Sequence, residues 1–519
     1  MAEERYTTIA AIDIGTSKVS CAIAHIGGEN GSISVIGKGT CANQGMRKGV
    51  VTDIEKTGAA IRAAVDAAER LSGYHIEHAT ITISGSHVLG QNTSGQVAVA
   101  NPDREIRDDD VDRVLEVCRA IEVPNSRMLL NVLPSSYIVD GQEGIQQPRG
   151  MIAYRLEARA HLITAGSTAV QNLEKCVQAA GIAVDDYVPA SLAAAELTLS
   201  ETERELGTVL VDIGAETCDI AIFHQNAVVY TAVLPIGGAF ITRDVAIGLK
   251  TSLAAAEELK TTYGTCDPRT ASESEQYNVP DEAAGRRISR LELARIIEPR
   301  MSEIFDLVAG VIANAGPEVT SAGVVLTGGG SQLEGVEALG REILKAPVRV
   351  ASPSGPLLGI LDEFRGPDRA AVLGLFSWVA RGLDEAGIAE DVGRAEAEGL
   401  QALRDGADHE GARVVSGDHD AGDEQVAVGV DAGQGREIGE PGGVSADVVN
   451  LGEHLADRAA EAADRRGVGA RVELDEEGGI GRAGGQGERA DAGGGGGDLR
   501  GGGGVARPVP ALVGGEDGG

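Results

Sequence analysis

The chain has 519 residues, more than one hydrophobic core usually holds, so two or more domains are expected. Its formal net charge of −34 argues against nucleic acid as a partner, because phosphate binding needs a positive footprint. The six cysteines form no CxxC pair and no metal-binding spacing with histidine, which is typical of reduced thiols. There is no apolar signal region and no long apolar run, so we expect a soluble cytoplasmic protein.

Up to about residue 383 the sequence alternates short apolar, β-like runs with helical patterns, such as those at 54–71 and 169–180. This alternation indicates a globular α/β protein.

The first motif is a predicted β-hairpin at 9–23, IAAIDIGTSKVSCAI. Its Asp-x-Gly turn presents backbone N–H groups, and Gly15 lets a phosphate approach the main chain. Asp13, at the end of the strand, can hold the water shell of Mg²⁺. Side chains that can donate to a phosphate follow at Thr16, Ser17 and Lys18.

The same frame occurs again at 207–223, GTVLVDIGAETCDIAIF. Asp212 matches Asp13 and Gly214 matches Gly15, both 199 residues later, and Thr217 supplies a hydroxyl. One Asp-x-Gly hairpin is most often an ordinary turn. Two in a matched frame favour a duplicated fold, in which one hairpin from each lobe faces a shared cleft and clamps a triphosphate.

A helix is predicted at 254–264, AAAEELKTTYG. Glu257 and Lys260 lie three residues apart on one face of it. Taken alone, this pattern indicates a surface ion pair of little energetic consequence.

Residues 323–336, GVVLTGGGSQLEGV, predict a buried strand, a turn of three glycines and a helix starting near Ser331. In such a turn, backbone donors and the helix dipole meet a ligand with no Cβ in the way. The spacing is neither GxGxxG nor a Walker motif, so neither a dinucleotide fold nor a P-loop NTPase is supported. Alone the motif indicates a tight turn, but beside two matched hairpins we favour a ligand site.

From residue 384 onward the composition changes. This segment has no Lys, Phe, Tyr, Trp, Met, Cys or Thr, holds 35 of the 73 glycines, and has 30 acidic residues against 12 arginines. It cannot bury enough apolar area to offset its chain entropy, so we expect a disordered tail with a transient helix at 451–466. Two origins stay open: a native acidic tail, or GC-rich DNA read in an unintended frame.

Several longer stretches make the chain resemble the actin-like ATPase superfamily and, within it, the FtsA family of bacterial cell-division proteins. The resemblance covers roughly residues 7–382. Its most specific stretches are SGSHVLGQNTSGQVAV (84–99), LLNVLPSSYIVDGQEGIQQPRGM (129–151), LEARAHLITAGSTAVQNLEKCVQAAG (156–181), LPIGGAFITRDVAIGL (234–249), AEELKTTYG (256–264) and VVLTGGGSQLEGV (324–336).

The resemblance implies an actin-like, two-lobed α/β fold with duplicated ribonuclease-H-like subdomains, one replaced subdomain in the first lobe, and the disordered tail outside it. The boundaries that it implies are 1–84 with 166–206 and about 360–382 for the core of the first lobe, 85–165 for the replaced subdomain, 207–244 and 300–359 for the core of the second lobe, 245–299 for its upper subdomain, and 383–519 for the tail.

It also implies ATP and Mg²⁺ as ligands. The phosphate-binding residues would be Asp13, Gly15, Thr16, Ser17 and Lys18 in the first hairpin and Asp212, Gly214, Ala215, Glu216 and Thr217 in the second. The residues at the adenosine would be Gly328, Gly329, Gly330 and Ser331, with Glu257 and Lys260 near the ribose and adenine. Asp13 and Asp212 would reach the magnesium through water.

By the same resemblance, the protein would form filaments and link the FtsZ ring to the inner face of the cytoplasmic membrane at the division site. The subdomain at 85–165 would make filament contacts and recruit later division proteins, and the C-terminal peptide of FtsZ would dock at 245–299. The alternatives are a small-molecule kinase or a chaperone-like ATPase on the same fold.

The chain departs from the family pattern in two places. Relatives often read Asp-x-Gly-Gly-Gly-Thr-Thr in the second hairpin, so Ala215, Glu216 and Cys218 stand in place of Gly, Gly and Thr. A carboxylate at 216 repels a γ-phosphate unless it points away or engages the metal. We therefore expect ATP to be a structural ligand, hydrolysed slowly or not at all, and assign no general base. After residue 383, no segment has the pattern of the amphipathic helix by which the family reaches membranes.

Overall fold

The computed structural model describes residues 6–27, 32–120, 123–280, 286–355, 357–359 and 364–385. They belong to one unit of the chain, Met1–Ala402, and all contacts given below are within it. The predicted disorder beyond residue 385 and the predicted helix at 451–466 lie outside the described residues.

The core of the first lobe is a six-stranded sheet in the order β11-β6-β1-β2-β3-β19. Its strands are β1 (Tyr6–Ile14), β2 (Lys18–Gly27), β3 (Ser32–Ala42), β6 (His78–Ile83), β11 (Ala183–Pro189) and β19 (Leu357–Leu358). Its helices are α1 (Ile54–Ser72), α3 (Ser167–Ala179), α4 (Ala190–Thr198) and α10 (Ala370–Glu385). The short helix α5 (Glu201–Leu206) follows α4 and packs against a strand of the second lobe. A short hairpin, β4 (Met46–Arg47) with β5 (Val50–Val51), precedes α1.

Local sequence accounts for the boundaries of α1 and for its close fit to the sheet. The Asp53 side chain caps the first turn by accepting from the Lys56 N–H at 3.1 Å, and Gly73 ends the helix at φ +77°. A Cβ at Gly37 or Gly39 of β3 would come within 3.0 Å of the α1 backbone. These two glycines therefore let the helix lie directly on the strand.

The second lobe repeats this architecture in a five-stranded sheet, β14-β13-β12-β17-β18. In each sheet a hairpin strand (β1 or β12) pairs antiparallel with the next strand along the chain and parallel with a later one (β6 or β17). The strands are β12 (Thr208–Ile213), β13 (Cys218–His224), β14 (Ala227–Leu234), β17 (Gly323–Thr327) and β18 (Val348–Val350). The predicted duplication is therefore confirmed at the level of strand order.

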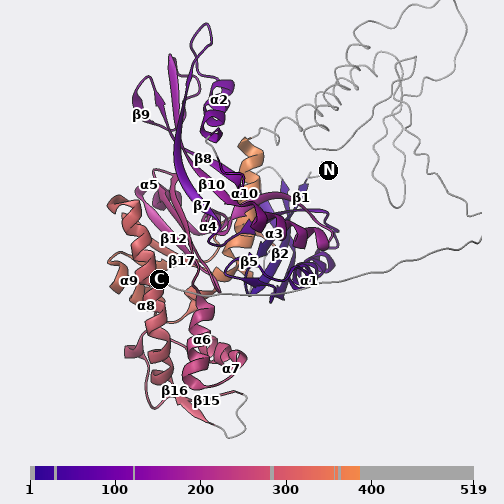
Figure 1. The fold of residues 1–519 in the computed structure, drawn as a ribbon, viewed down its shortest axis with the longest axis vertical. Coiled ribbons are helices and arrows are strands. Elements are labelled where there is room, and N and C mark those ends of the chain that lie inside the picture. The colour runs from indigo at the N-terminus through magenta and orange to yellow at the C-terminus, as the bar shows by residue number, and fades with distance from the viewer. Residues whose placement is uncertain are drawn as a thin grey trace, which may run out of the picture. The chain divides into compact units, whose positions relative to one another are not determined.

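Helices and short turns complete the second lobe (Figure 1). They are α6 (Gly238–Leu249), α7 (Leu253–Tyr263), α8 (Arg290–Ala315), α9 (Val336–Leu344), the small strands β15 (Gln276–Asn278) and β16 (Arg287–Ser289), and the 3₁₀ turns η1 (Pro268–Thr270), η2 (Pro317–Thr320) and η3 (Gly329–Gln332). A further 3₁₀ turn, η5 (Pro367–Arg369), leads into α10 and contacts η3.

A separate sheet, β7-β10-β8-β9, has a core of its own and extends away from the two lobes, with α2 against it (Figure 1). Its elements are β7 (Leu89–Ala98), α2 (Asp108–Arg119), β8 (Arg127–Val139), β9 (Gln142–Ile145) and β10 (Arg155–Gly166). We call it the inserted subdomain.

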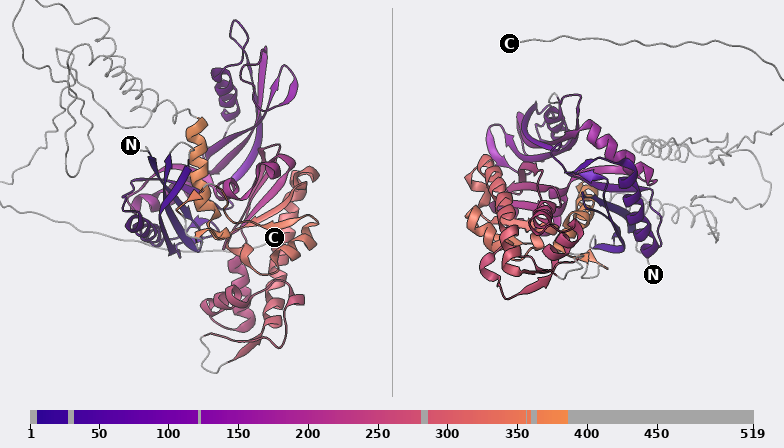
Figure 2. Two further views of the ribbon diagram at one scale, coloured as in Figure 1. Left: turned by 180° about the vertical axis from the view of Figure 1, so that it is seen from behind. Right: turned by 60° about the horizontal axis from the view of Figure 1, so that its bottom comes forward.

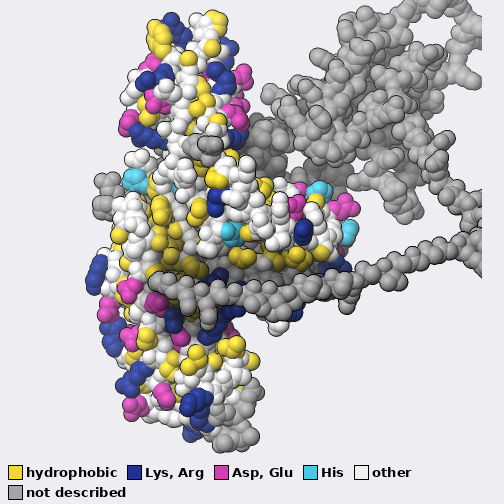
Figure 3. Space-filling model, viewed as in Figure 1, with side chains coloured by type: hydrophobic (Ala, Val, Ile, Leu, Met, Phe, Trp, Pro, Cys, Tyr) yellow, Lys and Arg dark blue, Asp and Glu magenta, His cyan; other side chains and the backbone are white. Residues whose placement is uncertain are grey.

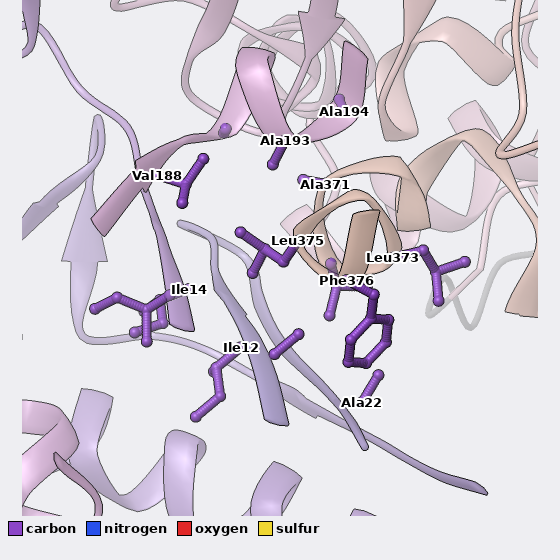
Figure 4. Packing of buried hydrophobic residues seen from close by; sticks show 14 of the residues in the cluster. Ile12, Ile14, Ala22, Val188, Ala193, Ala194, Ala371, Leu373, Leu375 and Phe376 are labelled. Atoms are coloured by element: carbon purple, nitrogen blue, oxygen red, sulfur yellow. The ribbon is translucent and has the colours of Figure 1, made fainter. Parts of the chain in front are cut away.

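The last described helix, α10, returns the chain to the first lobe (Figure 2). Its side chains Leu373, Leu375 and Phe376 are fully buried, and they belong to the same cluster as Ile12 of β1 (Figure 4). No helix within the described ranges is long and apolar enough to cross a membrane.

Candidate functional site

The two Asp-x-Gly turns face one cavity of about 630 Å³. Most of the residues predicted to bind the ligand line it. They are Asp13, Gly15, Thr16, Ser17, Lys18, Asp212, Gly214, Ala215, Thr217, Glu257, Lys260, Gly328, Gly329 and Gly330. Glu216 and Ser331 are not among the lining residues.

The two turns have the same closing hydrogen bond. The Gly15 N–H donates to the Lys18 carbonyl at 3.0 Å, and the Gly214 N–H donates to the Thr217 carbonyl at 2.9 Å. The duplicated sequence therefore folds into duplicated local geometry.

Glu216 points away from the cavity, although it lies in the second turn. Its Oε2 accepts from the Lys48 N–H at 2.9 Å, and its Oε1 is paired with Arg243. The carboxylate that was expected to repel a γ-phosphate is thus held elsewhere.

The prediction of a helix that starts near Ser331 is wrong, because the next α-helix, α9, begins only at Val336. The glycines lead instead into the 3₁₀ turn η3, where the Ser331 hydroxyl donates to the Gly328 carbonyl at 2.7 Å. Leu333 is then extended, and Gly335 adopts a left-handed φ of +84° before α9 starts. The sequence pattern did not reveal this interruption between turn and helix.

The glycine turn packs directly onto the end of β12. A Cβ at Gly328 would come within 3.0 Å of the Asp212 side chain, and Gly328 itself has φ +83°. A Cβ at Gly330 would clash in the same way with Ile213. The glycines therefore satisfy a packing requirement of the fold, and they also leave backbone exposed to the cavity.

Three carboxyl groups from the hairpins lie close together at the cavity. Burial raises the pKa of Asp13, and the hydroxyl of Thr82, which donates to it at 2.7 Å, partly offsets this. Burial, with Asp219 and Asp13 nearby, raises the pKa of Asp212 well above its ordinary value. Burial raises the pKa of Asp219 to about 7, although Ser84 donates to it at 2.7 Å. A cation bound here would relieve this electrostatic cost.

The basic side chains that line the cavity are already paired with carboxylates. Lys18 is paired with Asp368, Lys260 with Glu257 at 2.8 Å, and Arg290 with Glu334 at 2.5 Å. Of the described lining residues, six are acidic and three are basic. A polyphosphate would therefore bind far more favourably together with a divalent cation than alone.

Among the described residues, no group of three or more His, Cys, Asp or Glu side chains could enclose a metal ion. Mg²⁺ keeps several waters and uses one or two carboxylates together with ligand phosphates. The hairpin carboxyls thus fit a hydrated Mg²⁺ with a phosphate ligand better than a metal held by protein alone.

Sequence reasoning missed several lining residues, among them Ser84, Asp219, Arg290 and Asp368. Asp219 had a detectable signal in the sequence, because it is the charged residue in the apolar run CDIAIF at 218–223. Asp368 had no detectable signal in the sequence, because it lies 350 residues from Lys18, its partner in the fold.

The paired sheets, with matched hairpins at a shared cavity, define the protein as one of the actin-like fold. A solved structure described as "PilM-PilN type IV pilus biogenesis complex" shares this fold with a TM-score of 0.51 and 17% identity, covering 71% of this chain and 97% of that chain.

Sequence comparison then gives the family. The family described as "Cell division protein FtsA" matches residues 209–374, and "SHS2 domain inserted in FTSA" matches 85–164. The "Cell division protein FtsA" of Pseudomonas aeruginosa is 40% identical over 373 residues, covering 71% of this chain and 88% of that protein. The FtsA of Neisseria meningitidis serogroup B is 37% identical over 377 residues, covering 72% and 90%. The chain belongs to the FtsA family of cell division proteins, as its motifs predicted.

Proposed function

We propose that this protein acts in cell division as an ATP-binding, filament-forming protein that links the FtsZ ring to the cytoplasmic membrane. Membership of the FtsA family supports the role in cell division. The cavity between the duplicated turns supports nucleotide binding. The observation that carries the proposal is the meeting of two Asp-x-Gly turns and three neighbouring carboxyls, one buried and two half-buried, at one cavity.

The hairpin residues would hold the nucleotide as a magnesium complex. Thr16, Ser17 and Thr217 line the cavity with hydroxyl donors suited to phosphate oxygens, and Lys18 would exchange Asp368 for a phosphate. Asp13 and Asp212 would hold waters of the metal. When bound, Mg²⁺ neutralises phosphate charge that the acidic lining cannot.

ATP would be a structural ligand in this protein. Because Glu216 is engaged by Lys48 and Arg243, it does not oppose binding. No side chain of the chain is assigned as a general base, and slow or absent hydrolysis is the expectation.

The region at 245–299 would take the C-terminal peptide of FtsZ. Exposed apolar side chains lie there at Ile247, which is 75% exposed, and at Leu253, which is 58% exposed. These side chains offer a peptide apolar contacts. The inserted subdomain would make filament contacts and recruit later division proteins, at the inner face of the membrane at the division site.

The binding test compares the wild type with Asp212→Ala. We expect the variant to lose measurable ATP binding in a titration with a fluorescent nucleotide, while its circular dichroism is unchanged. Removing one of three mutually repelling carboxyls should not lower the thermal midpoint. An unchanged ATP affinity in the folded variant would contradict the proposed clamp.

The division role is tested by sedimentation with ATP and the FtsZ C-terminal peptide, alongside phosphoryl-transfer assays on a panel of metabolites. Filaments and peptide binding without transfer support the proposal. Rapid phosphoryl transfer to a metabolite would favour a small-molecule kinase and refute the proposed role in division.

A further inference from the structure

One short turn of the first lobe contacts both Asp-x-Gly turns. It joins β4 to β5 and has left-handed residues at Lys48 (φ +49°) and Gly49 (φ +76°). The Lys48 N–H donates to Glu216 Oε2 at 2.9 Å, across the boundary between the lobes. The Gly49 N–H donates to Thr16 Oγ1 at 3.3 Å, within the first lobe. Two successive amides thus connect the two turns of the candidate site.

Glu216 is the anchor of this connection on the second lobe. The residue is only 4% exposed, and its other oxygen is paired with Arg243 of α6. The start of α6 is in turn fixed to the second hairpin, since the Gly238 N–H donates to the Gly214 carbonyl at 2.9 Å. A buried carboxylate with both oxygens engaged by donors is held firmly.

Phe240 of α6 contacts side chains on both sides of this connection. The Arg243 guanidinium lies 4.9 Å from its ring centroid and the Lys48 ammonium 5.7 Å. The side chains of both residues that donate to Glu216 therefore contact one aromatic ring of α6. The ring adds a second link, a cation–π contact, between the Lys48 turn and the second lobe.

The position of the Gly49 amide has a chemical consequence at Thr16. Because that N–H occupies a lone pair of Thr16 Oγ1, the hydroxyl proton remains available to donate elsewhere. Thr16 lines the cavity, where an anionic ligand would accept that proton. If the Lys48 turn moves away, the Thr16 side chain is free to rotate, and its hydroxyl proton no longer points into the cavity.

We propose that Glu216 is a positioning residue that fastens the Lys48–Gly49 turn across the cleft, directs the Thr16 hydroxyl at a phosphate of the ligand and slows ligand release. Only the effects on the bound phosphate and on ligand release rest on the proposed nucleotide binding; the fastening of the turn does not. It gives a function to one of the residues by which this chain departs from the usual second hairpin.

The first experiment needs no nucleotide. Hydrogen–deuterium exchange of the full chain is followed by mass spectrometry on peptides covering 44–52, in the wild type and Glu216→Ala. We expect roughly tenfold faster exchange in these peptides, because the Lys48 amide loses its charged acceptor. Glu196→Ala is the matched control: Glu196 also pairs with arginines, Arg204 and Arg381, but has no link to the turn. Unchanged protection at 44–52 in Glu216→Ala would overturn the proposal.

The second experiment measures dissociation of a fluorescent ATP analogue with Mg²⁺ in the wild type, Glu216→Ala, Thr16→Val and the double variant. We expect each single change to speed release roughly tenfold and the double variant to release no faster than the singles. If the accelerations of the two single variants multiply in the double variant, Glu216 does not act through Thr16. A merely structural role of Glu216 predicts this multiplication, because the two residues would then affect release independently. If Glu216→Ala fails to fold, Glu216→Gln replaces it, with a smaller acceleration expected because an acceptor for Lys48 remains.

The two experiments separate the inference from the function on which it rests. A wild type that binds no nucleotide refutes the proposed function and the effect on release, whereas the exchange result alone decides whether Glu216 fastens the turn.

Discussion

At the scale of single residues, the basic side chains of the candidate site are paired with carboxylates that a bound phosphate would have to replace. Lys18 is paired with Asp368, which comes from η5 at the other end of the described chain. Although burial acts to raise it, the nearby Lys18 and Arg369 hold the pKa of Asp368 below its ordinary value, so this carboxyl is charged at neutral pH. Asp368 and a phosphate would therefore compete for the same ammonium group.

This competition predicts the effect of Asp368→Asn. Without the carboxylate, Lys18 is free for the phosphate, and we expect affinity for ATP with Mg²⁺ to rise about tenfold, while affinity for adenosine stays the same. Isothermal titration calorimetry measures both. Asp186→Asn is the control, since Asp186 accepts from Trp378 of α10 away from the cavity. A fall in ATP affinity would show that Asp368 supports the metal instead.

At the scale of elements, α10 depends on a close approach to α4. A Cβ at Gly374 would come within 3.0 Å of the Ala193 carbonyl, so the two helices touch through backbone at this point. Leu375 and Phe376 next to it are fully buried in the first-lobe core (Figure 4).

We therefore expect Gly374→Ala to lower the free energy of unfolding by about 2 kcal/mol, because the added methyl group separates α10 from α4. Gly382→Ala, in the same helix, is the matched control, since no atom of the described residues lies within 4 Å of its Cβ position. That change should stabilise the helix by up to about 1 kcal/mol. Urea unfolding of both variants checks the sign, and equal effects at the two positions would contradict this account.

A second contact between elements joins the inserted subdomain to the second lobe. His161 of β10 is bonded to Asn92 of β7 at 2.6 Å and to Thr231 of β14 at 2.9 Å. Asn92 also donates to the Val229 carbonyl of β14 at 3.1 Å. Burial of the ring lowers the pKa of His161 to about 4.

This junction predicts a dependence of stability on pH. The unfolded chain takes up a proton on His161 near its ordinary pKa of about 6.5, whereas the folded protein does so only near 4. The contribution to stability is therefore complete above pH 6.5 and is lost as the pH falls toward 4, by roughly 3 kcal/mol in total. Unfolding of wild type and His161→Gln between pH 7 and 4 should show their difference shrinking, and a constant difference would refute the role of His161.

At the scale of the whole molecule, charge and ligand act together. The chain has a formal net charge of −34, yet on the face shown in Figure 3 basic and acidic side chains are interspersed over the inserted subdomain. The inserted subdomain contains ion pairs such as Arg107–Asp103 and Arg159–Glu143. The acidic cavity between the lobes is where a bound cation would have the largest local effect.

A ligand that contacts both lobes should stabilise the folded protein as a unit. At 100 times its dissociation constant, ATP with Mg²⁺ should add about 2.7 kcal/mol to the free energy of unfolding and raise the thermal midpoint. Chelating the metal with EDTA while ATP is present should remove most of this gain, because six acidic residues line the cavity. Equal stabilisation with and without the metal would contradict the charge balance described above.

Much of the fold was predictable because local patterns specify it. The helices at 54–71 and 169–180 are confirmed as α1 and α3, since apolar periodicity and capping residues such as Asp53 act within one element. The duplicated hairpins are confirmed for the same reason, because each turn closes on itself through a bond of three residues' span. The subdomain boundaries and the ligand contacts stay predictions.

By itself, the sequence determined the strands, the turns and the family, because hydrophobic period, glycine placement and motif order are properties of neighbouring residues. Only the tertiary structure decided that Glu216 turns to Lys48, that Asp368 meets Lys18 and that His161 joins β14. Each of these contacts joins residues about 70 or more positions apart, where the partner is selected by how lobes and sheets pack, and no local pattern carries that information.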